Sequence, residues 1–224
     1  MTDGTLRAAL FDLDGTLVDS LPTVAAAMSA ALADFAYEVA PDTIVPLIGA
    51  PMPVLAAQLT GADAAAAARI NERFLELYYD RFMPGTRPLP GAAALLDRLA
   101  ARGVRLAVVT NKNEQGGHAM VDLQGWSGRF ELIVGRETAS QPKPDPAGAL
   151  HALAHLGATP EQAAFVGDTE FDMHAARDAA MRYRIGLVAS RSEQQLREAG
   201  ATHAVRDLDA VGAILLGAVD VAAG

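Results

Sequence analysis

The chain has 224 residues and a net charge of −9 at pH 7, because 27 acidic side chains outnumber 18 basic ones. Hydrophobic residues make up 51% of the chain and charged residues 20%, which excludes global disorder and allows a sizeable core. The acidic balance argues against nucleic acid and anionic membranes as partners. The absence of cysteine excludes disulfides, thiol nucleophiles and Cys-ligated metal centres.

Neither end of the sequence has the pattern of a targeting or membrane segment. The apolar run near the N-terminus is short and is interrupted by Asp12. The apolar stretch at residues 211–219 is too short to cross a bilayer and contains two glycines. We therefore expect a cytoplasmic protein.

Five short apolar runs, each bounded by turn residues, are typical of strands that are buried on both faces of a parallel sheet. They are residues 6–11, 104–109, 130–134, 163–166 and 184–188. Helical patterns separate the later runs, one with a leucine-rich face at residues 92–99 and one between Pro146 and Gly157. This alternation predicts an α/β fold, with a doubly wound parallel sheet as its core.

The region after the first strand does not alternate in this way. Residues 18–88 contain three Ala-rich helical stretches, punctuated by prolines, at residues 23–35, 54–59 and 62–82. We therefore expect a core domain made of residues 1–17 and 89–224. We expect residues 18–88 to form an inserted, all-helical cap domain that closes over the functional site and selects the substrate.

Polar residues with chemical potential follow three of the predicted strands. Asp12 and Asp14 come after the first, Thr110 and Asn111 after the second, and Asp168 after the fourth. Each of them alone is common as a helix cap. The carboxyl ends of parallel strands meet at one edge of the sheet, where ligands bind, and the shared edge therefore favours a functional site.

The predicted convergence of carboxylates has an electrostatic consequence. Two like charges about 4 Å apart cost on the order of 4 kcal/mol at an effective dielectric constant near 20. Asp12, Asp14 and Asp168, with Asp172 one helical turn further on, must therefore bind protons or a cation. All-oxygen ligands favour a hard ion such as Mg²⁺, which in turn suggests a phosphate-bearing partner.

Lysine is scarce in this chain, since Lys112 and Lys143 are the only two among the 18 basic residues. Lys143 lies between Pro142 and Pro144, which restrict the backbone on both sides. We interpret it as a positioned charge for a phosphate group, the other reading being a solvated loop residue.

Four stretches in order along the chain resemble the motifs of haloacid dehalogenase superfamily phosphatases. They are residues 11–20 (FDLDGTLVDS), 109–112 (VTNK), 143–146 (KPDP) and 167–172 (GDTEFD). Within the superfamily the chain is most similar to phosphoglycolate phosphatases and their relatives with a helical cap after the first motif. The stretch at residues 187–191 (LVASR) departs from this pattern, because the family usually has a Gly-rich loop there. The segment at residues 178–181 (DAAM) also departs from the family's usual ending of the fourth motif.

The resemblance implies a role for each motif residue in covalent phosphoryl transfer. Asp12 would attack phosphorus to form an aspartyl-phosphate, and Asp14 would act as general acid and then as general base. Gly15 would let the backbone pass close to the phosphoryl oxygens. Thr110, through its hydroxyl group, and Asn111, through its backbone N–H, would hold those oxygens.

The resemblance also implies the charged partners of the phosphate. Lys143 would neutralise the charge of the phosphate and the nucleophile. Mg²⁺ would be held by the Asp12 carboxylate, the Asp14 backbone carbonyl and Asp168. Asp172 would bind the ion through water or would support its ligands.

We therefore expect a Mg²⁺-dependent phosphomonoester hydrolase that acts on a small phosphorylated metabolite, with phosphoglycolate as the leading substrate. A sugar-phosphate mutase and a pyrophosphatase or nucleotidase of the same superfamily are alternatives. The mutase branch typically has a histidine in its cap, and this chain has no histidine before His118. A non-catalytic phosphate-binding module is a remote alternative, because both Asp12 and Asp14 are present. The sequence does not indicate the oligomeric state.

Overall fold

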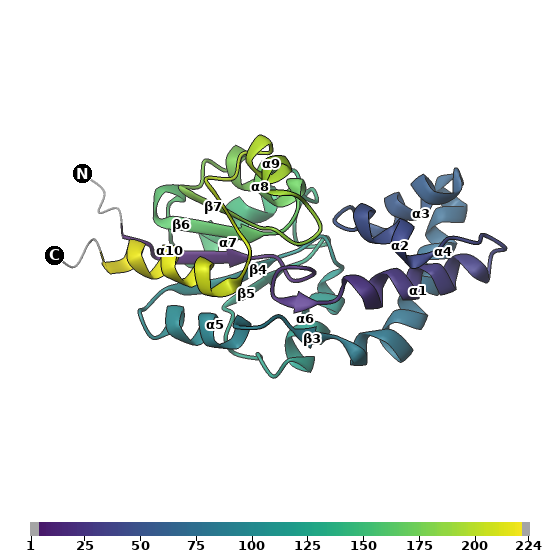
Figure 1. Ribbon diagram of the computed structural model, residues 1–224, viewed down its shortest axis with the longest axis horizontal. Helices are drawn as coiled ribbons and strands as arrows, with labels where there is room; N and C mark the ends of the chain where they lie inside the picture. Colours follow the sequence, from purple (N-terminus) through teal and green to yellow (C-terminus); the bar gives the residue numbers. More distant parts are fainter. Residues whose placement is uncertain (1–4, 221–224) are drawn as a thin grey trace. The chain divides into compact units, whose positions relative to one another are not determined.

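The computed structural model describes residues 5–220. The chain divides into two compact units. The core unit comprises the residues up to Val18 and those from Pro88 onward, and the helical unit comprises Asp19–Arg87. Figure 1 labels the elements of both units, which are described one at a time below.

The described part of the core unit contains a six-stranded sheet with the order β5-β4-β1-β6-β7-β8, and its neighbouring strands pair in parallel. The strands are β1 (Ala8–Phe11), β4 (Arg105–Val109), β5 (Leu132–Val134), β6 (Ala163–Gly167), β7 (Tyr183–Leu187) and β8 (His203–Val205). In the central strand β1, Leu10 lies opposite Ala107 on one side and Phe165 on the other. The strand order changes direction at β1, and in sheets of this kind ligands usually bind at the carboxyl ends of the strands at such a position.

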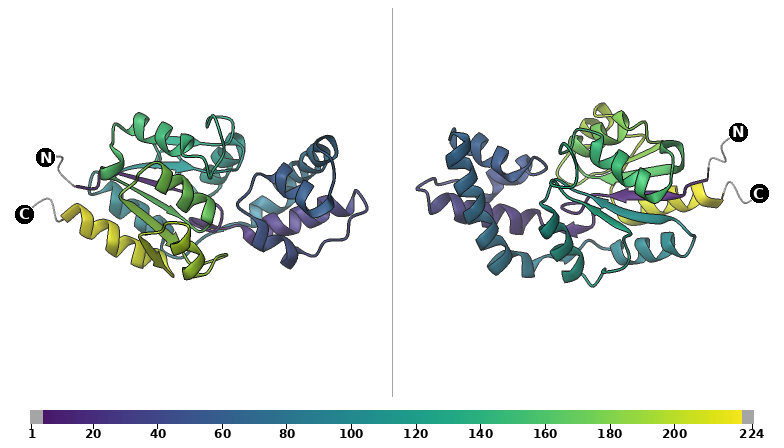
Figure 2. Two further views of the ribbon diagram at one scale, coloured as in Figure 1. Left: turned by 90° about the horizontal axis from the view of Figure 1, so that it is seen from above. Right: turned by 180° about the vertical axis from the view of Figure 1, so that it is seen from behind.

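Helices cover both faces of this sheet (Figure 2). They are α5 (Ala92–Ala100), α6 (Glu114–Leu123), α7 (Ala147–Leu156), α8 (Glu170–Asp178), α9 (Glu193–Glu198) and α10 (Leu208–Asp220), with a short 3₁₀ turn at Pro160–Gln162. A buried cluster joins α7 and α8 to β1, β4, β5 and β6, and it includes Leu10, Leu153 and Phe165. Because all the central strands are covered on both faces, their sequences are continuously apolar rather than alternating.

Several local signals in the sequence lie where the structure needs them. Pro146 is the N-cap of α7, and Gly157 ends that helix in the left-handed conformation. Thr159 and Gln162 form a capping box around the 3₁₀ turn. The expected doubly wound α/β fold with a helical insertion is confirmed.

The helical unit consists of α1 (Leu21–Ala33), α2 (Pro41–Ile44), α3 (Met52–Thr60) and α4 (Ala64–Leu77) among its described elements, with 3₁₀ turns at Val45–Leu47 and Met83–Gly85. Its core lies between α1 and α4, where Met28, Ile70 and Phe74 are buried. The Asp63 side chain caps α4 by accepting from the Ala66 N–H at 2.8 Å. This unit is held together by apolar side chains on helix faces.

One predicted helix needs correction, and three short strands were not predicted. The helix predicted over residues 62–82 ends at Leu77, and the chain then forms a wider π turn at Tyr78–Phe82 before Pro84, which cannot continue a helix. Strand β8 was not predicted, because its three residues are only half-buried and have no apolar run. Two short strands that sequence analysis also missed, β2 (Val18–Asp19) and β3 (Arg87–Pro88), pair where the chain leaves and re-enters the core unit. No helix within the described residues is both long enough and apolar enough to cross a membrane.

Candidate active site

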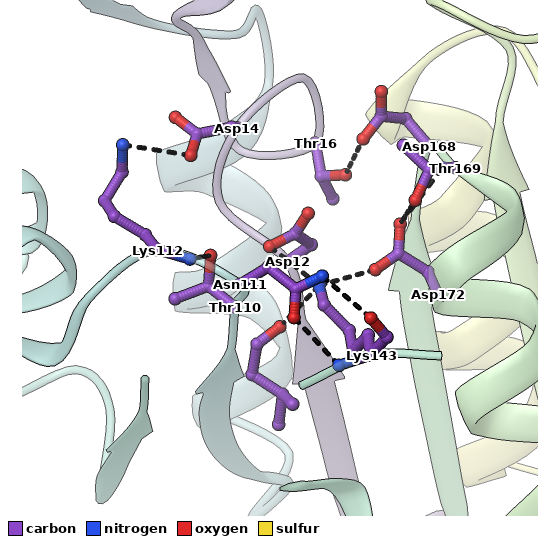
Figure 3. A network of polar contacts seen from close by, with 11 residues as sticks. Asp12, Asp14, Thr16, Thr110, Asn111, Lys112, Lys143, Asp168, Thr169 and Asp172 are labelled. Atoms are coloured by element: carbon purple, nitrogen blue, oxygen red, sulfur yellow. Dashed lines mark hydrogen bonds and ion pairs between the residues drawn. The ribbon is translucent and has the colours of Figure 1, made fainter. Parts of the chain in front are cut away.

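The candidate active site lies at the carboxyl end of β1, where Asp12 follows the strand directly (Figure 3). The Asp12 backbone N–H donates to the Val166 carbonyl at 3.0 Å, so the link with β6 continues one residue beyond the strand. The Asp12 side chain is buried, with the whole residue 6% exposed. The sheet therefore fixes the backbone of Asp12, the residue that carries this carboxylate.

Two glycines allow the acidic side chains to approach one another. Gly15 has a φ of +75°, and a Cβ atom there would lie 2.5 Å from Asp168 Oδ2. A Cβ atom on Gly167 would overlap the Asp172 side chain. Any other residue at either position would displace a carboxylate, which explains why glycine occurs in both motifs.

Three buried carboxylates meet in this space. Asp12, Asp168 and Asp172 each offer one oxygen, and these atoms lie within 4.8 Å of one another. Asp168 is anchored on both oxygens, because Thr16 Oγ1 donates to Oδ1 at 3.1 Å and Ser190 Oγ donates to Oδ2 at 2.9 Å. The structure thus brings Asp12, which follows β1, together with Asp168, which follows β6, and Asp172, which lies in the first turn of α8.

Asp172 is positioned by the start of α8. Its Oδ2 accepts from the Thr169 N–H at 3.0 Å and from the Thr169 hydroxyl at 2.7 Å, which completes a capping box. Its Oδ1 accepts from Lys143 Nζ at 2.6 Å. Asp172 thus accepts three hydrogen bonds, one of them from the ammonium group, whereas Asp168 accepts two from hydroxyl groups, so Asp172 is better suited to holding Lys143 than to ligating an ion directly.

Lys143 reaches the cluster from the proline-flanked loop. Its Nζ donates to the Val109 carbonyl at 2.9 Å and lies 3.0 Å from Asp12 Oδ1, and the residue is 4% exposed. The Asn111 side chain holds the Lys143 backbone twice, accepting from its N–H at 2.8 Å and donating to its carbonyl at 3.0 Å. The ammonium group is therefore fixed by the backbone as well as by the carboxylates.

The charges of this cluster do not balance. Burial raises the pKa of Asp12 to about 6, against the lowering effect of Lys143. Burial, followed by the charge of Asp172, raises the pKa of Asp168 well above its usual value. Burial alone would lower the pKa of Lys143, but Asp12 and Asp172 outweigh it and raise the pKa. One ammonium group thus faces three carboxylates, a deficit that a divalent cation would remove.

The atoms present fit such a cation. Asp12 Oδ1 is buried and accepts no hydrogen bond of good geometry among the described residues, although it lies close to Lys143 Nζ. The donor set contains only oxygens, which favours Mg²⁺ over softer metals.

Asp14 and Lys112 form a separate ion pair beside the cluster. Lys112 Nζ lies 3.1 Å from Asp14 Oδ2, and their side chains are 10% and 15% exposed. Figure 3 shows the Asp14 carboxylate directed toward Lys112 rather than toward Asp168. Thr110 is buried, and its hydroxyl accepts from the Lys112 N–H at 3.2 Å. The structure therefore gathers Asp14, Thr110 and Lys112 on one side of the site.

Sequence reasoning missed four residues that contact the predicted ones: Thr16, Lys112, Thr169 and Ser190. Thr16, Lys112 and Thr169 lie inside the motifs, so their position beside the predicted site residues could have identified them. Ser190 lies in a segment that departs from the family pattern, and nothing in its spacing pointed to Asp168.

Comparison with known proteins identifies the family of the chain. The model of the haloacid dehalogenase-like hydrolase family matches residues 9–196. The phosphoglycolate phosphatase of Aquifex aeolicus is 33% identical over 81% of this chain and 85% of its own length. The phosphoglycolate phosphatase of Pseudomonas putida is 33% identical over 99% of this chain and 83% of its own.

Solved structures agree at the level of the fold. A phosphoglycolate phosphatase assigned by prediction, from Haemophilus somnus, has a TM-score of 0.85 at 26% identity and covers 96% of this chain and 99% of its own. A phosphatase from Clostridium acetobutylicum, also assigned by prediction, has a TM-score of 0.87 at 23% identity, covers 95% and 99%, and shows the fold alone. The predicted resemblance to capped phosphatases is confirmed. The chain therefore belongs to the haloacid dehalogenase-like hydrolase family, as an enzyme of its phosphatase type.

Proposed function

We propose that the protein is a Mg²⁺-dependent phosphomonoester hydrolase that acts on a small phosphorylated metabolite through an aspartyl-phosphate on Asp12. The observation that carries this proposal is the buried Asp12 carboxylate, which lies 3.0 Å from Lys143 Nζ and within 4.8 Å of the oxygens of Asp168 and Asp172. A nucleophile surrounded in this way can approach a phosphate dianion only if cations offset the charge.

The ligands proposed for Mg²⁺ are the Asp12 carboxylate, the Asp14 backbone carbonyl and Asp168. When bound, the ion supplies positive charge that offsets the negative charge of the phosphoryl group and of the nucleophile. Asp172 supports this arrangement by holding Lys143, since its Oδ1 accepts from the ammonium group and its Oδ2 already accepts two hydrogen bonds from Thr169.

Asp12 supplies the nucleophile of the first half-reaction. Its oxygen bonds to phosphorus while the bond from phosphorus to the ester oxygen breaks. Asp14 gives its proton to the departing alkoxide. Asp14 then accepts a proton from the water that attacks phosphorus, the Asp12–phosphorus bond breaks, and the free carboxylate and inorganic phosphate result.

Three residues from one strand end and one loop are proposed to hold the phosphoryl oxygens. Thr110 contributes its hydroxyl group and Asn111 its backbone N–H. The Asn111 side chain already bonds the Lys143 backbone in both directions, which supports a backbone role for Asn111 toward the phosphate. Lys143 supplies a fixed positive charge. Gly15 keeps the adjoining loop free of a side chain.

Phosphoglycolate is the substrate we propose first, because the relatives named above carry that activity in their names. We propose residues 18–88 as the cap domain and the source of substrate selectivity, since the core supplies only groups that act on the phosphoryl end. The alternatives, a sugar-phosphate mutase and a pyrophosphatase or nucleotidase, share those groups.

Ranking a panel of substrates by kcat/KM tests the proposal. The panel contains phosphoglycolate, an aryl phosphate, hexose phosphates, pyrophosphate and nucleotides, each with Mg²⁺ and with a chelator. We expect Mg²⁺-dependent release of phosphate, highest for phosphoglycolate, and none from Asp12→Asn. Interconversion of hexose phosphate isomers would support a sugar-phosphate mutase. Preference for pyrophosphate or nucleotides would support a pyrophosphatase or nucleotidase. Absence of turnover with every ester would contradict the proposed function.

A further inference from the structure

The loop between β7 and α9, residues 188–192, makes a direct contact with the candidate metal site. Ser190 Oγ donates to Asp168 Oδ2 at 2.9 Å. This is the same segment that lacks the expected Gly-rich sequence. A glycine at position 190 could not make this hydrogen bond, so the departure adds a side-chain donor to an acidic residue that we propose as a ligand.

The hydrogen bonds of Asp168 leave room for an ion. A carboxylate offers about four lone-pair directions. Thr16 uses one on Oδ1 and Ser190 uses one on Oδ2. The two donors restrain the carboxylate at both oxygens, so rotation of the group would break both bonds. A ligand held in this way loses little freedom when a cation binds.

The neighbouring residue gives the loop a second attachment to the same segment. Arg191 Nε donates to Glu170 Oε2 at 2.6 Å, and its Nη2 donates to Oε1 at 3.3 Å. Arg191 is 9% exposed, and its third nitrogen, Nη1, is buried without a hydrogen-bond partner among the described residues. The loop thus contacts Asp168 through one residue and Glu170 through the next.

Both ends of the loop are also fixed. The Val188 N–H donates to the Val205 carbonyl at 2.7 Å, next to the β7–β8 ladder. Ser192 begins α9 with a capping box that involves Gln195. Leu196 of α9 packs with Met173 of α8 in a small apolar cluster. The Ser190 hydroxyl is therefore presented by a loop with little freedom to move.

We propose that Ser190 is a positioning residue that orients Asp168 for the divalent cation, and that the Arg191–Glu170 ion pair holds Ser190 in place. This inference rests on one part of the proposed function, the binding of Mg²⁺ by Asp168, and does not depend on the substrate or on the covalent intermediate.

Titration of metal-free protein with Mg²⁺, followed by calorimetry, tests the inference without any substrate. We expect Ser190→Ala to bind Mg²⁺ about tenfold more weakly than the wild type, the range in which groups that orient a ligand usually act. Ser190→Thr keeps the hydroxyl and should restore most of the affinity. Thermal unfolding of the metal-free proteins measures any purely structural effect.

Thr159→Ala is the matched control, because it removes a hydroxyl that caps the 3₁₀ turn at Pro160–Gln162, at the opposite end of β6 from Asp168. It should lower the melting temperature and leave the affinity for Mg²⁺ within twofold of the wild type. A merely structural role for Ser190 predicts the same behaviour for both alanine variants, which would overturn the proposal.

Arg191→Met tests the second attachment. Arg191 is the partner to remove, because the Glu170 side chain is 37% exposed and can be hydrated when alone. We expect a loss of Mg²⁺ affinity of severalfold. Arg197→Met, which removes an exposed ion pair with Glu193 on α9, should change nothing. Unchanged affinity in Arg191→Met would refute the proposed role of the ion pair.

Asp168→Asn separates failure of this inference from failure of the proposed function. If the wild type binds Mg²⁺ and Asp168→Asn does not, the metal site stands and the Ser190 variants decide the inference. If the wild type and Asp168→Asn give the same titration, the proposed metal site is wrong, and with it the role of Ser190.

Discussion

The only two lysines of the chain both lie in the candidate active site, but in different surroundings. Lys143 is 4% exposed and contacts Asp12, Asp172 and the Val109 carbonyl. Lys112 pairs with Asp14 at 3.1 Å, nearer to solvent. The first lysine is held by several oxygens that do not need to move, whereas the second is paired with the carboxylate that we propose to exchange protons.

The difference shows how one site can contain fixed and exchangeable charge. A buried ion pair is costly to break, because removing one partner leaves the other charge unpaired in a poorly solvated place. The Lys112–Asp14 pair is also largely buried, with side chains 10% and 15% exposed, but it joins one ammonium group to one carboxylate, so opening it leaves less charge unpaired than at Lys143. We therefore propose that Lys143 keeps its contacts throughout the reaction as a fixed positive charge. The Lys112–Asp14 pair opens when Asp14 donates or accepts a proton.

The largest effect should come from the nucleophile of the buried cluster. Asp12→Asn should lower kcat by at least about 1,000-fold, because the amide cannot form the covalent intermediate. Steady-state assays with an aryl phosphate measure this, and circular dichroism checks that the variant folds. Full activity in a folded Asp12→Asn protein would refute the covalent mechanism.

Replacing the buried lysine should affect both activity and stability. Lys143→Met should lower kcat by about 100-fold or more, because the fixed charge near the phosphoryl group is lost. In metal-free protein it should also cost about 3 kcal/mol in the free energy of unfolding, because Asp12 and Asp172 remain without their cation. Urea unfolding measures the second effect, and a loss below about 1 kcal/mol would show that the cluster is more hydrated than its burial indicates.

The raised pKa of Asp12 predicts how pH acts on the metal-free cluster. Between its ordinary value of 3.8 and about 6 the folded protein holds this proton more tightly than the unfolded chain does. The stabilisation from the proton is therefore complete below about pH 4 and is lost as the pH rises to about 6. Relative to Asp12→Asn, the wild type should lose up to about 3 kcal/mol over this interval.

Bound Mg²⁺ should reverse this pH dependence of the stability of the wild type relative to Asp12→Asn. A bound cation favours the charged carboxylate, so saturating Mg²⁺ should stabilise the wild type more at pH 7 than at pH 5, and more than it stabilises Asp12→Asn. Urea unfolding at the two pH values, with Mg²⁺ and with a chelator, measures all four differences. Equal stabilisation of wild type and variant would mean that the ion binds elsewhere.

The smallest effect should come from the more exposed lysine. Lys112→Met should cost about 1–2 kcal/mol in the free energy of unfolding, less than Lys143→Met, because only one carboxylate loses its cation, and it should lower kcat by less than tenfold. Measured beside Lys143→Met, it compares an ammonium group paired with one carboxylate with an ammonium group paired with two. An equal loss of stability in the two variants would remove the distinction drawn between the lysines.

Much of the core could be predicted because parallel strands that are buried on both faces have short, continuous apolar runs in the sequence. The runs at residues 104–109 and 163–166 became β4 and β6 with shifts of one residue at an end. Strand β8 has no such apolar run, since it is short, half-buried and at the edge of the sheet. Its pairing with β7 depends on tertiary packing that local propensity does not encode.

The candidate site was predictable to the extent that its residues follow strand ends. Asp12 and Asp168 were expected together because the ends of their strands share one edge of the sheet, and Lys143 was expected beside them from the resemblance of its motif. The orientation of each side chain was not predictable. That Asp172 holds Lys143, and that Ser190 reaches Asp168 from another strand, follow from hydrogen bonds between distant segments. Such contacts depend on the folded backbone rather than on spacing.

The stereochemistry at phosphorus tests the central claim, covalent transfer through Asp12, most directly. The substrate is an ester whose thiophosphoryl group is made chiral with oxygen isotopes, hydrolysed in water that carries a third isotope. Two successive in-line displacements, the first by Asp12 and the second by water, predict overall retention of configuration in the released thiophosphate. Inversion would show that water attacks the ester directly, and it would contradict the account.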